Sequence, residues 1–178
     1  MCMSETSKQH KDTALEKLVF AIYVCSTSRF RQMERGEPVS DLGGELIQSL
    51  IQASGYTVLY KKILLDDTTV IAQAVKDCLS VADLDVIIFS GGTGVVSADV
   101  TIEAVLPFLE KSLPGFGEFF RRISFDEIGS AAVLSRALAG VASGKVFFCI
   151  PGSLNAVGTA VEKLILPEAP HIVKHARE

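Results

Sequence analysis

A glycine-rich turn follows one of the apolar segments of the chain. It consists of Ser90, Gly91, Gly92, Thr93 and Gly94, directly after the apolar run at residues 84–89. Glycines let successive backbone N–H groups point into one concavity, which suits an anion such as a phosphate. No Walker lysine follows, and Ser97 stands where a dinucleotide fingerprint needs its third glycine. By spacing alone, a tight turn between a strand and a helix is an equally good interpretation.

A second turn of this kind, Pro151-Gly152-Ser153, comes after the apolar run at residues 146–150. Ser153 is a candidate N-cap for the helix that follows, and a helix N-terminus attracts anions. Simple capping is the ordinary explanation for such a serine. Two turns of this type nevertheless favour a ligand with more than one anionic group.

Two of the segments that leave predicted strands carry carboxylates. Asp66 and Asp67 end an amphipathic segment, and Asp99 comes five residues after Gly94. A carboxylate beside a phosphate site is repulsive unless a cation or a proton-transfer role accounts for it. Mg²⁺ is the usual bridge, because it accepts phosphate oxygens, waters and one or two carboxylates together. Helix capping is the alternative for Asp67 and Asp99.

The other reactive side chains indicate no further site. His171 and His175 are four residues apart but lie near the end of the chain without a third ligand, so we expect a solvated tail there. No Ser/His/Asp or Cys/His set for nucleophilic catalysis is evident. The four cysteines form no C-x-x-C pair, which is typical of reduced thiols in a cytoplasmic protein.

The elements that must position these groups alternate along the chain. Apolar runs predict strands at residues 18–25, 56–65, 84–89 and 146–150. Helical spacing predicts helices that begin near Asp41, near Asp67, at about residue 100 and after Ser153, and a polar arginine-rich loop precedes the first of them. This order predicts a three-layer α/β/α fold with a mostly parallel sheet.

In such a fold ligands bind beyond the carboxyl ends of the strands. The loops that leave the predicted strands should therefore meet at one edge of the sheet. These loops are residues 26–28, 66–67, 90–99 and 151–153.

Length and charge limit the other classes of function. The chain has 178 residues and a formal net charge of −4, which fits one domain at residues 17–178 after a flexible extension at residues 1–16. No basic stripe is present to displace counterions from a nucleic acid. No apolar run reaches the roughly 18 residues that a membrane span needs.

Taken together, the motifs closely resemble those of the molybdopterin-binding MoaB/Mog family, its MoaB branch in particular. The resemblance runs from about Val19 to the last helix and covers nearly all of the chain except the extension. The residues that carry it are the 90–94 turn with Asp99, Val100 and Thr101; Pro114 to Glu118 with Arg121; Leu134 to Arg136; and Pro151 to Ser153.

This resemblance implies an activity and an assembly. The activity would be adenylylation of molybdopterin by Mg-ATP with release of pyrophosphate, as a step in molybdenum cofactor biosynthesis that prepares for the insertion of molybdate or tungstate. The assembly would be a trimer or a dimer of trimers, acting with the other proteins of cofactor biosynthesis in the cytoplasm.

The resemblance also assigns the site. Asp66 and Asp99 would be the catalytic carboxylates and the ligands of Mg²⁺. The residues that would bind the nucleotide and the pterin are Ser26, Gly91, Gly92, Thr93, Gly94, Thr101, Glu118, Pro151, Gly152 and Ser153.

Two positions depart from the pattern of many family members. Ala98 replaces a basic residue before Asp99, and Thr27 replaces an aspartate after Ser26. They leave open a non-catalytic molybdopterin-binding or carrier protein, whereas retention of Asp66 and Asp99 favours an enzyme. An unrelated nucleotide-binding module that shares only the glycine turns is a remoter alternative.

Overall fold

A six-stranded sheet forms the centre of the protein in a computed structural model that describes residues 17–178. The strand order is β2-β1-β3-β6-β5-β4. The strands are β1 (Val19–Cys25), β2 (Thr57–Leu64), β3 (Val86–Ser90), β4 (Lys111–Ser112), β5 (Leu138–Ala142) and β6 (Lys145–Ile150). β2, β1, β3 and β6 pair in parallel, and β5 is antiparallel to both of its neighbours. The expectation of a mostly parallel sheet is confirmed.

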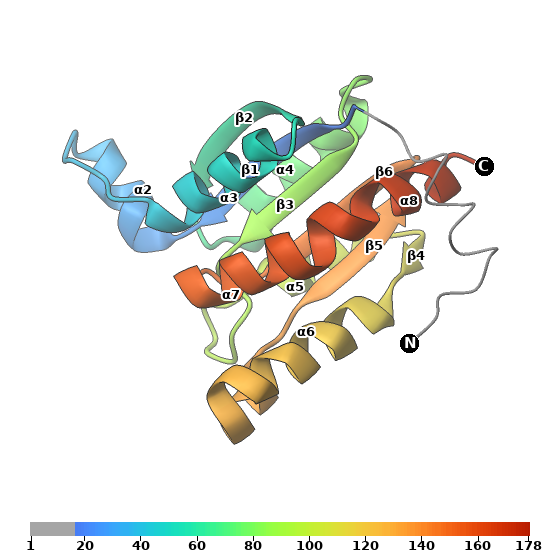
Figure 1. Cartoon of the computed structure of the whole chain (residues 1–178). Helices are drawn as coiled ribbons and strands as arrows, with labels where there is room; N and C mark the ends of the chain where they lie inside the picture. The colour runs from blue at the N-terminus through green and yellow to red at the C-terminus, as the bar shows by residue number, and fades with distance from the viewer. Residues whose placement is uncertain (1–16) are drawn as a thin grey trace.

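Helices cover both faces of this sheet (Figure 1). One face is covered by α3 (Leu42–Ala53), α6 (Pro114–Ile128), α7 (Leu154–Ala160), a π-helical turn at Val161–Ile165 and α8 (Leu166–Ala176). The other is covered by α4 (Thr68–Ser80), α5 (Thr101–Val105) and a 3₁₀ turn at Leu106–Phe108. The remaining elements are α2 (Thr27–Glu34), which projects from the edge of the molecule in Figure 1, and a 3₁₀ segment at Gly129–Leu134. The three-layer α/β/α fold is confirmed.

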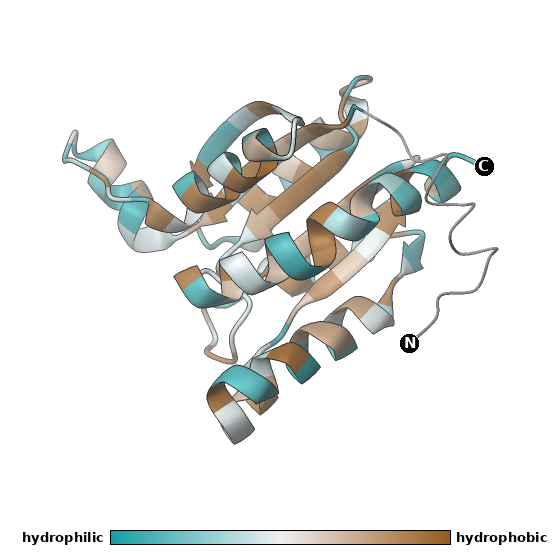
Figure 2. Ribbon diagram, in the orientation of Figure 1, coloured by the Kyte–Doolittle hydropathy of each residue, from teal (hydrophilic) through white to brown (hydrophobic). Residues whose placement is uncertain are grey.

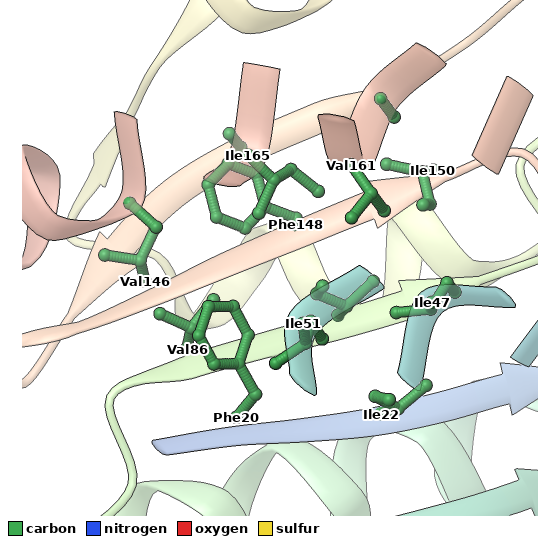
Figure 3. Packing of buried hydrophobic residues seen from close by; sticks show 14 of the residues in the cluster. Phe20, Ile22, Ile47, Ile51, Val86, Val146, Phe148, Ile150, Val161 and Ile165 are labelled. Carbon is green, nitrogen blue, oxygen red and sulfur yellow. The ribbon is translucent and has the colours of Figure 1, made fainter. Parts of the chain in front are cut away.

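Strand β1 supplies side chains to both cores, because successive residues of a strand point to opposite faces. Phe20, Ile22 and Val24 join the cluster under α3 and α7, and Ala21, Tyr23 and Cys25 join the one under α4. Figure 3 shows Phe20 and Ile22 among the first set, and Figure 2 shows the apolar character of the central strands. A strand buried on both faces is a continuous apolar run, and this explains residues 18–25.

The pairing of β1 with β2 contains one irregularity. Phe20 pairs with Val58, whereas Ala21 pairs with Tyr60, so Leu59 has no partner in the register and forms a bulge. Beyond it the pairing is regular as far as Cys25 and Leu64. The carboxyl ends of these two strands are therefore level.

Several local expectations differ from the structure. The polar segment after β1 forms α2 instead of a loop, and the helix expected at 100–109 is the short α5 followed by a 3₁₀ turn. β4 and β5 were not expected from the sequence pattern. His171 and His175 lie in α8 instead of a solvated tail, with their ring centroids 4.5 Å apart.

The predicted extension at residues 1–16 lies outside the described residues. Within residues 17–178, no helix has the length and apolar character needed to cross a membrane.

Candidate active site

The loops that follow β1, β2, β3 and β6 meet at the carboxyl edge of the sheet, as the sequence predicted. Backbone hydrogen bonds tie them together there. Ser26 N donates to Leu64 O at 2.9 Å, which joins the ends of β1 and β2. Gly91 N donates to Ile150 O at 3.0 Å, which joins the ends of β3 and β6.

The glycines of the 90–94 turn are needed because the chain bends sharply against its neighbours. Gly91 and Gly92 have φ angles of +101° and +61°, a region that side chains disfavour. A Cβ on Gly91 would collide with the carbonyl oxygen of Cys25, and one on Gly92 would lie 2.7 Å from Asp66 Oδ1. Close packing against Cys25 and Asp66 therefore determines the shape of the turn.

Asp66 lies next to this turn and uses its two carboxylate oxygens differently. Oδ2 accepts hydrogen bonds from the Thr27 backbone N at 2.9 Å and from Thr27 Oγ1 at 3.2 Å. Oδ1 is buried and has no hydrogen-bond partner among the described residues. A buried carboxylate oxygen without a donor is costly, so its position indicates a ligand or a cation.

Thr101 lies on the other side of Gly92. Its hydroxyl would be in the way of a Gly92 Cβ, and its backbone N donates to Gly92 O at 2.9 Å. Apart from the thiol of Cys25, a weak partner, this buried hydroxyl has no hydrogen-bond partner within residues 17–178. Asp66 Oδ1 and Thr101 Oγ1 thus converge on the same glycine.

Asp99 lies over the far end of the turn. Its Oδ2 accepts a hydrogen bond from Val96 N at 3.1 Å, and a Cβ on Gly94 would lie 2.5 Å from this oxygen. The capping alternative for Asp99 is wrong, because Val100 is the N-cap of α5 and no side chain caps that helix. Asp67 does cap α4, since its Oδ1 accepts from Thr69 N and Val70 N.

Pro151, Gly152 and Ser153 extend the site on the side of β6. A Cβ on Gly152 would lie 3.3 Å from the Gly91 Cα, so the two glycine turns touch. Ser153 occupies the N-cap position of α7, yet its hydroxyl makes no capping hydrogen bond and stays available to a ligand. A pocket of about 410 Å³ opens here, lined by Ser124, Glu127, Ile128, Ser135, Pro151, Ser153, Leu154, Asn155 and Ala156.

Two of the predicted binding residues lie apart from the open surface of the site. Thr93 is buried in the turn at 3% exposure, so it supports the turn's shape. Glu118 is exposed on α6 and lines a separate hollow with Arg121, Arg122 and Phe125. Within one chain the structure places Glu118 and the Pro151–Ser153 turn on different hollows.

The thiol of Cys25, which is close to Asp66, is unreactive at neutral pH. Burial raises the pKa of Cys25 to about 12, opposed by a hydrogen bond with Thr101 and reinforced by the charge of Asp66. Burial likewise raises the pKa of Cys149 well above its ordinary value. A thiol that keeps its proton at neutral pH is a poor nucleophile, so these residues pack the floor of the site.

The side chains present suit a cation that is shared with a substrate. Among residues 17–178 no cluster of three or more His, Cys, Asp or Glu side chains could hold a metal by itself. Asp66 and Asp99 supply two carboxylates, and the buried Oδ1 of Asp66 lacks a donor. Mg²⁺ is commonly bound through one or two carboxylates together with substrate phosphates and waters. The donor set therefore fits Mg²⁺ that arrives with a nucleotide.

Sequence reasoning missed several residues that shape the site. Thr27 was noted as part of the 26–28 loop and as a departure from the family pattern, but not as the residue that holds Asp66. Gly43 at the start of α3 packs against the Gly152 carbonyl, where a Cβ would lie 3.4 Å away. The pocket side chains of Ser124, Glu127 and Asn155 come from α6 and α7 and carry no motif of their own. The only signal for Thr27 was its place at the end of β1.

A comparison with known protein families decides the assignment of the chain. The family described as a probable molybdopterin binding domain matches residues 21–171. The chain belongs to this family. All the residues that line the carboxyl edge, from Ser26 to Ser153, lie within the matched range.

Individual members of the molybdopterin-binding family are also similar along nearly their whole length. A probable molybdopterin adenylyltransferase of Methanocaldococcus jannaschii is 38% identical over 164 residues, which cover 92% of this chain and 97% of the relative. The molybdenum cofactor biosynthesis protein B of Bacillus anthracis is 42% identical over 165 residues, which cover 92% of this chain and 94% of that protein.

Solved structures of the family have the same fold. A crystal structure of a molybdenum cofactor biosynthesis protein B has a TM-score of 0.83 at 41% identity, covering 90% of this chain and 96% of that chain. The tungsten cofactor synthesizing protein MoaB of Pyrococcus furiosus has a TM-score of 0.81 at 37% identity, covering 93% and 100%. The three-layer fold described above is the MoaB/Mog fold, as the sequence resemblance implied.

Proposed function

We propose that the protein is a molybdopterin adenylyltransferase in molybdenum cofactor biosynthesis. The observation that carries this proposal is the buried, donor-free Oδ1 of Asp66 beside two touching glycine turns. Similarity to the probable molybdopterin adenylyltransferase of Methanocaldococcus jannaschii supports the same reaction class. A site with backbone amides for phosphates and carboxylates for a cation suits a reaction between two phosphate-bearing substrates.

The reaction joins the two substrates through their phosphates. An oxygen of the terminal phosphate of molybdopterin attacks the α-phosphorus of ATP, forming a new P–O bond. The bond between the α-phosphorus and the oxygen that bridges to the β-phosphorus breaks, and pyrophosphate leaves with that electron pair. A phosphate dianion needs no general base, so positioning and charge neutralisation account for most of the rate.

Different residues of the site would bind the phosphates, the cation and the organic part of a substrate. The backbone amides of the 90–94 turn and the start of α7 at Ser153 would hold phosphate oxygens. Asp66 and Asp99 would hold Mg²⁺, which supplies positive charge to the reacting phosphates. The pocket of about 410 Å³ at Pro151 and Ser153 would take the organic part of one substrate. Glu118 would act only if a neighbouring subunit brings it close.

We also propose a homo-oligomer, a trimer or a dimer of trimers, that works in the cytoplasm with other cofactor biosynthesis proteins. Exposed apolar side chains on α6 and the following 3₁₀ segment support an interface between copies. These residues are Phe119, Phe125, Ile128, Val133 and Leu134. The free, buried thiols of Cys25, Cys78 and Cys149 suit a reducing compartment.

The direct test incubates the purified protein with molybdopterin and Mg-ATP and separates the products by chromatography. We expect adenylylated pterin and pyrophosphate in equal amounts. Asp66→Asn and Asp99→Asn should each lower turnover by at least about 100-fold while the protein remains folded, because each removes a charge that would hold the cation. Full turnover in both variants would show that neither Asp66 nor Asp99 has the proposed catalytic role.

A molybdopterin carrier is the second candidate. The departures from the family pattern at Ala98 and Thr27 are the observation that favours it. A carrier would bind molybdopterin tightly, and ATP would remain intact in the same incubation. Failure to bind any pterin would instead favour a nucleotide-binding module of another kind.

A further inference from the structure

The orientation of Asp66 depends on one neighbour. Thr27 donates to Oδ2 from both its backbone N and its hydroxyl, at 2.9 and 3.2 Å. The Asp66 backbone N in turn lies 3.3 Å from Thr27 Oγ1 and donates to it. The threonine hydroxyl therefore donates a hydrogen bond to the Asp66 carboxylate and accepts one from the Asp66 backbone N–H.

This reciprocal contact determines what the second oxygen can do. With Oδ2 held by two donors, rotation of the carboxylate is restricted and Oδ1 faces Gly92. Oδ1 is buried and receives no hydrogen bond within residues 17–178. No Lys or Arg of the described chain forms an ion pair with Asp66. Oδ1, the oxygen that faces the glycine turn, is thus the carboxylate oxygen that no donor compensates within residues 17–178.

A simpler role for the contact is structural. Thr27 is the first residue of α2, and Asp66 satisfies one of the backbone N–H groups that a helix leaves without a partner at its start. That role requires only the backbone N–H of Thr27, which every residue except proline supplies. The hydroxyl adds nothing to capping, because Ser26 already provides the side-chain cap by accepting from Arg29 N. The hydroxyl can therefore be tested separately.

We propose that Thr27 is a positioning residue, whose hydroxyl holds Asp66 so that Oδ1 is presented to the cation of the reaction. This inference rests on the proposed function, in which Mg²⁺ joins Asp66 to the phosphates. It also gives Thr27 a role of its own in this chain. Neighbours that orient a metal ligand commonly change metal affinity or activity by roughly 10- to 100-fold when they are lost.

Two substitutions at Thr27 separate the hydroxyl from the backbone. Thr27→Val keeps the shape and the N–H but removes the hydroxyl, whereas Thr27→Ser restores the hydroxyl. Thr57→Val is the matched control, because Thr57 is exposed at the opposite end of β2. Circular dichroism and urea unfolding verify that each variant is folded.

The first readout is cation binding, followed by electron paramagnetic resonance with Mn²⁺ in the presence of ATP. We expect the apparent Kd for Mn²⁺ to rise by roughly tenfold in Thr27→Val and to return to within about twofold of wild type in Thr27→Ser. Thr57→Val should match wild type. Equal Kd values in wild type and Thr27→Val, or a serine variant as weak as the valine variant, would overturn the proposal. So would a wild-type protein that binds no Mn²⁺ with ATP.

The second readout is turnover with molybdopterin and Mg-ATP. Thr27→Val should lower kcat by roughly 10-fold or more with little change in KM for molybdopterin, because both hydrogen bonds of the hydroxyl go to Asp66. A change in KM for molybdopterin alone would contradict a positioning role. If wild type binds Mn²⁺ with ATP through Asp66 but forms no product, the adenylyltransferase assignment fails, whereas the cation-binding result still decides the role of Thr27.

Discussion

Asp66, in the loop after β2, and Thr101, the first residue of α5, approach the same glycine from two sides. A Cβ on Gly92 would lie 2.7 Å from Asp66 Oδ1 and would collide with Thr101 Oγ1. The carboxylate and the hydroxyl therefore form two walls of one small space, and only a hydrogen atom on the Gly92 Cα fits between them. One consequence of this crowding can be measured directly.

Gly92→Ala should damage both stability and ligand binding. The φ angle of +61° and the collision with Thr101 each disfavour a side chain, so we expect a loss of about 1–3 kcal/mol in the free energy of unfolding. Gly158→Ala in α7 is the control, since a Cβ there meets nothing within 4 Å. That change should leave stability equal or raise it by about 0.5–1 kcal/mol. Urea unfolding and Mg-ATP binding measure both; an unaffected Gly92→Ala would contradict the packing described.

Alkaline pH should destabilise the fold through its buried thiols. Burial raises the pKa of Cys25 from 9.0 to about 12, so between these values the unfolded chain loses a proton that the native protein keeps. Stability must then fall as pH rises through this window, by about 1.4 kcal/mol per pH unit for each such group.

Cys25→Ala tests the contribution of this one thiol. Urea unfolding under reducing conditions at several pH values from 8 to 11 should show a shallower decline in the variant than in wild type. Cys78 and Cys149, whose pKa values burial also raises, keep part of the slope. Identical slopes in the two proteins would mean that Cys25 ionises as readily in the native state as in the unfolded one.

The apolar surface of α6 should govern assembly. Phe119 and Phe125 are 64% and 56% exposed in the single chain, which is unusual for aromatic side chains of this size. Phe119→Glu and Phe125→Glu should shift the protein toward smaller species in light scattering coupled to gel filtration. Met33→Glu on α2, at a position 46% exposed, is the control and should leave the assembly unchanged. Wild-type protein that is monomeric at micromolar concentration would remove the proposal of an oligomer.

The sequence pattern predicted the central sheet well, and the reason is physical. β1, β3 and β6 are buried on both faces, so each appears as an unbroken apolar run. β4 has only two residues, and β5 combines small residues with a glycine, so neither produces a recognisable period. α2 contains no buried residue, and a helix without an apolar face leaves no stripe in the sequence.

The site was predictable in its parts but not in its contacts. The carboxyl-edge rule brought Asp66, the 90–94 turn and Pro151–Ser153 together correctly. It could not show that one oxygen of Asp66 faces Thr27 and the other faces Gly92. That arrangement depends on β1 and β2 ending side by side, which the sequence pattern does not reveal. Nor could it show that Asp99 binds the amide of Val96 instead of capping α5.

The bulge at Leu59 explains why Cys25 and Leu64, the last residues of β1 and β2, lie side by side. Before the bulge, residues of β2 are numbered 38 ahead of their partners in β1, as Val19 and Thr57 show; after it, the offset is 39, as Cys25 and Leu64 show. The hydrogen bonds between Thr27 and Asp66 continue the second offset. If the first offset continued without a bulge, the aliphatic Leu65 would lie opposite Thr27 and Asp66 would lie one residue beyond it. The bulge at Leu59 therefore takes up one residue near the start of β2, and this places Asp66 instead of Leu65 beside Thr27 at the other end of the strand.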